Sequence, residues 1–149
     1  MKFTVIAVGK LKERFWTAAC DEYLKRLKPY APTQVIEVPD NGITREAEAV
    51  ARALDKLPAQ ARIVLLAIDG AARTSEGLST HLDDLALHGT SEVAFVIGGS
   101  DGVAQSVRDQ ADETLSFGPI TLPHNLARVV LLEQLYRAQK ISRGEPYHK

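Results

Sequence analysis

The chain has 149 residues, of which 45 % are hydrophobic and 25 % are charged, and its formal net charge is −1 at pH 7. This is the composition of a globular domain with a buried core, and it excludes an intrinsically disordered chain. The near-neutral charge argues against a protein that coats nucleic acid non-specifically. No apolar run reaches the roughly 18 residues of a transmembrane helix, so no membrane is expected as a partner.

The apolar stretch over residues 1–9 has no basic leader and no cleavage site, so it is expected to be a strand and not a signal peptide. The single cysteine, Cys20, excludes an intramolecular disulfide and a cysteine-based metal cluster. The four histidines lack metal-ligand spacing, so no metal is expected. Since no linker or repeat is visible, these features predict one cytoplasmic domain over residues 1–149.

Strand and helix patterns alternate along the chain. Apolar runs rich in β-branched residues predict strands at residues 2–8, 34–38, 62–68, 92–97 and 114–117. Apolar side chains at helical spacing predict helices at residues 13–27, 44–57, 75–87, 103–111 and 125–142. Thr44 and Asn125 are the expected N-caps of the second and fifth helices. This strict alternation predicts an α/β fold, with a mostly parallel sheet and helices on both faces.

Glycine-rich or irregular segments follow the third, fourth and fifth predicted strands. They are Asp69-Gly70, Gly98-Gly99-Ser100-Asp101-Gly102 and residues 117–122. Ligands of open α/β sheets bind beyond the carboxyl ends of the strands, so these three loops are expected to form one pocket, although tight turns also explain the glycines. The sequence has neither a dinucleotide fingerprint nor a Walker lysine, which favours a nucleoside or a small cofactor with little phosphate.

Polar groups concentrate in the last third of the chain. His124 stands between a proline and a helix start, which favours an exposed imidazole, and Arg128 follows four residues later on the same side of the helix. Glu133 and Arg137 are also four residues apart, and they form either a surface pair or a buried pair that needs a ligand. The tail over residues 145–149 is either a docked segment or a frayed end.

Five segments of the chain together resemble the ribosomal RNA large subunit methyltransferase H family, a group of SPOUT-class enzymes. The residues that carry the resemblance are 5–12, Phe95-Val96-Ile97-Gly98-Gly99-Ser100-Asp101-Gly102, Leu122-Pro123-His124 with Arg128, Glu133-Gln134-Leu135-Tyr136-Arg137-Ala138 and Arg143-Gly144-Glu145-Pro146-Tyr147-His148-Lys149. The resemblance implies a SPOUT-type fold with a C-terminal trefoil knot. It also implies a homodimer in which the partner's residues complete each active site.

The activity that the resemblance implies is methyl transfer from S-adenosylmethionine to N3 of a pseudouridine in 23S ribosomal RNA, within the large subunit or the whole ribosome. Carried over by position, the cofactor-binding residues are Leu66, Gly98, Gly99, Phe117, Gly118, Pro119, Ile120, Thr121 and Leu122. The candidate catalytic residues are His124, Arg128, Arg137, Tyr147 and His148.

Chemistry suggests a role for each catalytic candidate. The N3 imide is a weak nucleophile while it is protonated, so a general base is expected, and His124 and His148 are the two candidates. Arg128, Arg137 and Arg143 can orient phosphate or stabilise the base anion, and Tyr147 can stack on a base.

Two other classes of protein remain open at this stage. The first is a non-catalytic ribosome-binding factor that uses the basic segments 10–28 and 124–149. The second is a flavodoxin-like nucleotide-binding domain, for which the phosphate-binding loop is missing.

Overall fold

The computed structural model describes residues 1–148 and contains the predicted strands and helices in the predicted order. The strands are β1 (Lys2–Val8), β2 (Thr33–Val38), β3 (Arg62–Ala72), β4 (Glu92–Ile97) and β5 (Glu113–Ser116). The helices are α1 (Arg14–Leu27), α2 (Ile43–Asp55), α3 (Ser75–Leu87), α4 (Gln105–Gln110) and α5 (His124–Ser142).

The strands form one parallel sheet in the order β2-β1-β4-β3-β5. The central strand β4 is buried along its whole length, as its continuous apolar run requires. All strand pairs are parallel, so the carboxyl ends of the strands lie at one edge of the sheet and their amino ends at the other. The predicted α/β architecture is confirmed.

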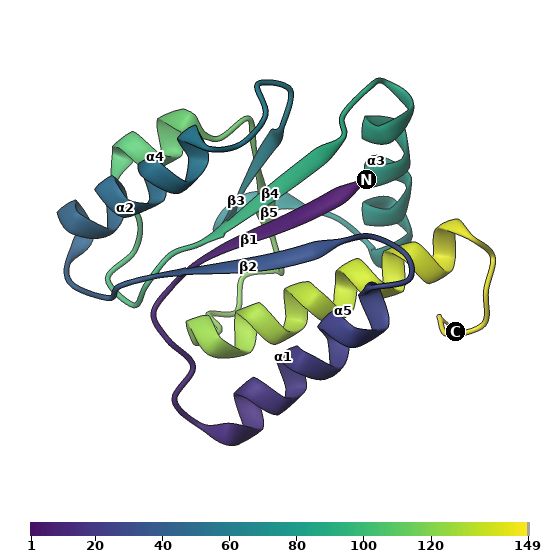
Figure 1. Cartoon of the computed structure of the whole chain (residues 1–149), viewed down its shortest axis with the longest axis horizontal. Coiled ribbons are helices and arrows are strands. Elements are labelled where there is room, and N and C mark those ends of the chain that lie inside the picture. Colours follow the sequence, from purple (N-terminus) through teal and green to yellow (C-terminus); the bar gives the residue numbers. More distant parts are fainter. Residues whose placement is uncertain (149) are drawn as a thin grey trace.

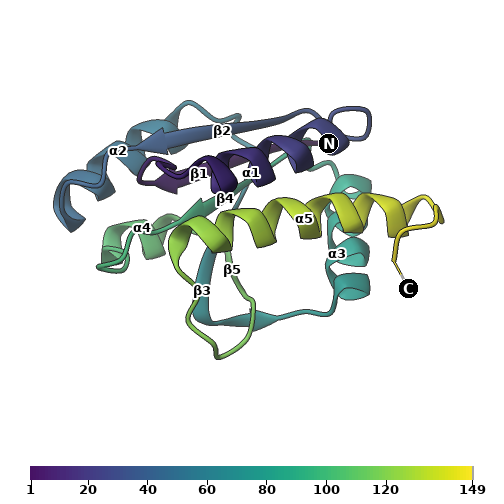
Figure 2. The same cartoon turned by 90° about the horizontal axis from the view of Figure 1, so that it is seen from below.

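Alternate strand residues point to opposite faces of the sheet, and each face has its own helices. Phe3 and Val5 pack into the core beneath α1, α3 and α5. Ile6 and Val8 pack into the core beneath α2 and α4. Figure 1 shows the two helix groups apart from each other, and Figure 2 shows α1 and α5 side by side, running in the same direction.

Two predicted helix N-caps are wrong. Gly42 is the N-cap of α2, and its N–H donates to the Glu46 carboxylate at 2.7 Å, so Thr44 lies inside the first turn. Pro123 is the N-cap of α5, and Asn125 accepts from the neighbouring Leu126 N–H at 3.0 Å. The fifth helix therefore begins at His124, whose backbone is part of the first helical turn.

Strand β3 is longer than predicted, because the chain returns to the sheet after residues 67–70. Leu66 and Ala71 both align with Leu115 of β5, so the four residues between them bulge out of the ladder. The Ser116 hydroxyl donates to the Ile68 carbonyl at 2.8 Å and fixes the bulge against the end of β5. The segment 67–70 therefore becomes a wall beside the edge of the sheet.

Candidate functional site

A cleft of about 560 Å³ opens beside the bulge of β3, where β4 and β5 end and α5 begins. Each of the three predicted loops contributes to it, so the expectation of one shared pocket is confirmed. Of the residues predicted to bind cofactor, the cleft is lined by Leu66, Gly98, Gly99, Phe117, Gly118, Ile120, Thr121 and Leu122. Pro119 is the one that does not line it, and it is exposed.

The walls of the cleft are mainly apolar. Ile120 is 73 % exposed and Ile68 is 54 % exposed, and both face the cleft. The cation that lines the cleft is Arg108 of α4, whose Nη1 lies 3.7 Å from the Asp69 carboxylate of the bulge. A pocket with apolar walls and few charges suits an aromatic ring system better than a polyphosphate.

The glycines of the loop after β4 are required by packing within the chain. A β-carbon on Gly98 would lie 2.6 Å from Val103 Cγ2, and one on Gly99 would lie 2.9 Å from Val8 Cγ1. Both distances are shorter than a normal carbon contact. Gly99 therefore lets the loop lie directly on β1, Gly98 lets the loop fold closely onto Val103, and both glycines line the cleft.

His124 lies at the rim of the cleft, as the first residue of α5. A β-carbon on Gly9 would lie 3.2 Å from His124 Nε2, so the imidazole rests against the backbone at the end of β1. Gly9 has φ of 95°, a left-handed conformation that glycine adopts most easily. The end of β1 and the start of α5 therefore form one compact corner of the site.

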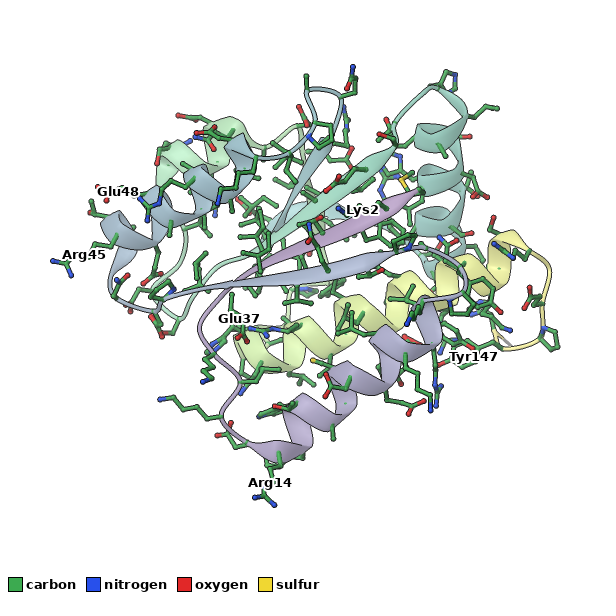
Figure 3. All side chains as sticks on the ribbon, in the orientation of Figure 1. Lys2, Arg14, Glu37, Arg45, Glu48 and Tyr147 are labelled. Atoms are coloured by element: carbon green, nitrogen blue, oxygen red, sulfur yellow. The ribbon has the colours of Figure 1, made fainter. Side chains whose placement is uncertain are left out.

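Arg128 is buried, although sequence analysis made it a candidate substrate contact. Its side chain is 3 % exposed; Nη1 donates to Glu37 Oε2 at 2.6 Å, and Nη2 donates to the Gly9 carbonyl at 2.9 Å. Figure 3 shows Glu37 on β2, next to α5. In this structure Arg128 does not reach a ligand in the cleft, because both terminal nitrogens are engaged inside the protein.

Arg137, Tyr147 and His148 come together at the far end of α5. Arg137 donates from Nε to Glu133 at 2.8 Å and from Nη1 to His148 Nδ1 at 3.1 Å. The Arg137 guanidinium also lies 4.7 Å from the centre of the Tyr147 ring, a cation–π contact. His148 Nε2 contacts the Glu76 carboxylate at the start of α3. The tail is docked as far as His148, so the frayed-end alternative is wrong there, and Lys149 lies outside the described residues.

These contacts shift the ionisation of the tail cluster. Burial and the nearby Glu133 carboxylate raise the pKa of Tyr147, so its hydroxyl stays protonated at neutral pH. The hydrogen bond to Glu133 raises the pKa of Arg137 and fixes its charge. The cluster therefore presents a protonated phenol and a permanent cation.

Several members of this cluster were not among the candidates predicted from the sequence. Tyr30, after the end of α1, donates to Glu145 at 2.6 Å, and Lys140 donates to the same carboxylate at 2.8 Å. The Tyr136 ring is edge-on to Tyr30 and to Tyr147, with centroids 6.1 Å and 4.8 Å away. The clue in the sequence is that two of the four tyrosines, Tyr136 and Tyr147, flank the basic C-terminal segment.

The catalytic candidates therefore form two groups in one chain. Arg137 follows His124 by 13 residues on the same helix, which places the two about 20 Å apart along its axis. The cleft and His124 lie at the start of α5, and Arg137, Tyr147 and His148 lie toward its other end. Figure 2 shows the C-terminus at that other end of α5. A single chain does not bring the two groups together.

A family model described as "Predicted SPOUT methyltransferase" matches residues 1–148. The chain belongs to the SPOUT methyltransferase family. It is 48 % identical to "Ribosomal RNA large subunit methyltransferase H" of Listeria welshimeri over 160 aligned positions, which include all of both chains. Proteins of the same name from Bacillus cereus strain B4264 and Bacillus anthracis are 47 % identical to it, again over both whole chains.

A solved structure shares the fold of this SPOUT methyltransferase. It is a probable methylase family protein from Haemophilus influenzae, with a TM-score of 0.59 over 99 % of this chain and 70 % of that one. The sequence identity is 11 %, so this likeness concerns the fold alone.

No helix in the described part of the chain is long and apolar enough to cross a membrane. Within residues 1–148, no three His, Cys, Asp or Glu side chains are grouped so as to hold a metal ion.

Proposed function

We propose that this protein transfers a methyl group from S-adenosylmethionine to ribosomal RNA of the large subunit, at N3 of a pseudouridine in 23S RNA. The observation that carries the proposal is the apolar cleft at the carboxyl edge of the sheet, with a histidine at its rim, in a SPOUT methyltransferase. Full-length relatives that are named as large-subunit ribosomal RNA methyltransferases support the choice of substrate.

The cleft suits this methyl donor in size and chemistry. Its volume of about 560 Å³ falls within the range of small-molecule sites, roughly 300–1,000 Å³. Leu66, Phe117 and Ile120 would pack against the adenine ring, and the backbone of residues 117–122 offers N–H and C=O groups to its polar edge. S-adenosylmethionine carries no phosphate, which agrees with the scarcity of cations. When bound, it supplies a methyl group on a positively charged sulfur.

His124 is the proposed general base at the cleft. The bound donor would supply its methyl carbon to N3 of the pseudouridine, with its carbon–sulfur bond broken and its sulfur released as a neutral thioether. The proton of N3 must pass to an acceptor, and the imidazole of His124 at the rim of the cleft is the proposed acceptor. That imidazole lies close to the backbone of Gly9, which limits the space in which the ring can turn before the substrate arrives.

We further propose that the enzyme acts as a homodimer, in which the tail of one chain completes the site of the other. In an isologous dimer with antiparallel α5 helices, Arg137, Tyr147 and His148 of one chain approach the partner's cleft. Apolar side chains on the outside of α1 and α5 support the choice of these two helices as the dimer interface. Phe15 is 64 % exposed, and Leu126 and Val130, four residues apart on α5, pack against neither core.

The proposal includes the trefoil knot and the single domain over residues 1–149. Segments 67–70 and 117–122 lie together at the cleft, where Ser116 contacts the Ile68 carbonyl. The chain then passes back beneath the sheet as α5. One continuous five-stranded sheet supports a single domain.

The proposed function is tested on ribosomes from a strain that lacks this protein. Mass spectrometry of 23S RNA nucleosides should show a missing methylpseudouridine, and the purified protein with S-adenosylmethionine should restore it. A protein that binds ribosomes without catalysis would show no S-adenosylmethionine binding by calorimetry, and that result would overturn the proposal.

A further inference from the structure

Arg128 is a buried cation in the first part of α5. It is 3 % exposed, and its Nε has no hydrogen-bond partner among residues 1–148. A buried guanidinium is costly unless its partners are well placed, and Arg128 has two, Glu37 and the Gly9 carbonyl. An apolar side chain could fill this position without the free-energy cost of burying a charge. Packing alone therefore does not explain why an arginine stands here.

The partners of Arg128 come from the ends of two neighbouring strands. Glu37 is near the end of β2, and Gly9 directly follows β1 and donates its N–H to the Val38 carbonyl at 2.8 Å. The same Glu37 oxygen that binds Arg128 also accepts the Leu11 N–H, at 3.4 Å. Arg128 thus joins β1, β2 and the following turn to the first part of α5.

Arg128 binds the end of β1 at Gly9, and the imidazole of His124 lies against the same residue. Arg128 and His124 are one helical turn apart on α5. Arg128 binds the carbonyl of Gly9, and a β-carbon built on the same glycine would lie 3.2 Å from His124 Nε2. A movement of Gly9 away from Arg128 would therefore remove the surface against which the imidazole rests.

We propose that Arg128 and Glu37 are a pair of positioning residues that fix the orientation of the His124 ring in the cleft. The inference rests on the proposed function, in which His124 accepts the proton. In this role Arg128 does not make the contact with RNA that was expected from the sequence. It acts on His124 indirectly, through its hydrogen bond to the Gly9 carbonyl. Since a displacement of about 1 Å can reduce a rate roughly a hundredfold, such a pair affects turnover without touching the substrate.

The test compares Arg128→Lys and Glu37→Gln with a matched control pair. Arg62→Lys and Glu113→Gln change a similar bond of 2.8 Å, between the first residues of β3 and β5 at the amino edge of the sheet. Each variant is assayed below its melting temperature for kcat and for the KM values of ribosomes and donor. Long-range nitrogen–proton NMR correlation spectra of the histidine side chains report the tautomer and the environment of the His124 ring.

The expected result is a fall in kcat of about tenfold or more for Arg128→Lys and Glu37→Gln, with both KM values within about twofold of wild type. The His124 signals should shift in these two variants and stay in place in the control pair. Three outcomes would overturn the inference: unchanged His124 signals, wild-type kcat in folded variants, or a rise in ribosome KM alone. Failure of the proposed function is a separate outcome, because it would appear as no methyl transfer by the wild-type protein.

Discussion

The two ends of α5 carry polar groups of similar chemistry in different settings. At its start, one arginine is buried and tied to the backbone of Gly9, and a histidine lies beside an open cleft. At its other end, arginine and histidine are tied to side chains, Glu133 and Glu76, and to a stacked tyrosine. The contacts at the start of α5 fix the backbone around the cleft. The contacts at its other end join side chains only, and a ligand or a partner chain can replace them.

The strongest test of this comparison is His124→Ala at the cleft. Loss of a general base should lower kcat roughly 10²–10⁴-fold, while calorimetry should show unchanged S-adenosylmethionine binding. The defect should shrink as pH rises, because the imide then ionises without help. His88→Ala, at the exposed end of α3, is the matched control. Normal turnover in a folded His124→Ala protein would remove this residue from the mechanism.

The second test asks whether the two ends meet across a dimer. His148→Ala, or removal of residues 147–149, should abolish transfer while donor binding remains. Chains carrying His124→Ala and chains carrying His148→Ala are then mixed under denaturing conditions and refolded together. If sites are shared between chains, half of the molecules are mixed dimers with one intact site each, so activity recovers to about one quarter of wild type. No recovery in folded mixed dimers would mean that each chain works alone.

The third test separates backbone strain from displacement of the imidazole. Gly9→Ala and Gly89→Ala both place a side chain at positive φ, 95° and 97°, and each should destabilise the protein by roughly 1 kcal/mol. Only Gly9→Ala adds an atom within 4 Å of His124. Thermal unfolding should therefore be similar for both, whereas kcat should fall about tenfold or more for Gly9→Ala alone. Equal kcat values would show that Gly9 does not hold the ring.

The smallest expected effect concerns the pH dependence of tail docking. Hydrogen bonds from Lys140 and Tyr30 lower the pKa of Glu145 below its ordinary value of 4.5. A lowered carboxyl pKa stabilises the docked tail above pH 4.5, and this contribution is lost as pH falls through the folded-state pKa. The protection factors of the Glu145, Tyr147 and His148 amides, which correct for the slower intrinsic exchange in acid, should therefore fall as pH is lowered. At neutral pH the same amides should be less protected in Glu145→Gln than in wild type. Unchanged protection in this variant would assign docking to Tyr147 and His148 instead.

The sheet and its helices could be predicted from the sequence because their signals are local. Residues 62–68 and 92–97 are long apolar runs, and residues 75–87 repeat leucines at helical spacing. The return of β3 to the sheet was missed, because Asp69-Gly70 has the composition of a turn and the partner that pairs with Ala71 is Leu115. Pairing between distant segments has no local signature.

The candidate site was only partly predictable for the same reason. Pro123 and His124 stand at a visible helix start, and the three loops follow visible strands, so the cleft could be placed from the sequence. The burial of Arg128 depends on Glu37, 91 residues away, and the docking of His148 depends on Glu76, 72 residues away. Neither contact could be inferred from the residues that surround the arginine or the histidine.

The close packing of Gly98 and Gly99 on Val103 and Val8 has a consequence for how quickly the cleft can be used. A loop that already lies on the sheet loses little conformational entropy when a ligand settles on it. Donor association should then follow a single concentration-dependent phase, without a slow closing step. The same packing makes this loop part of the folded core, so a variant that loosens it should lose thermal stability and donor affinity together.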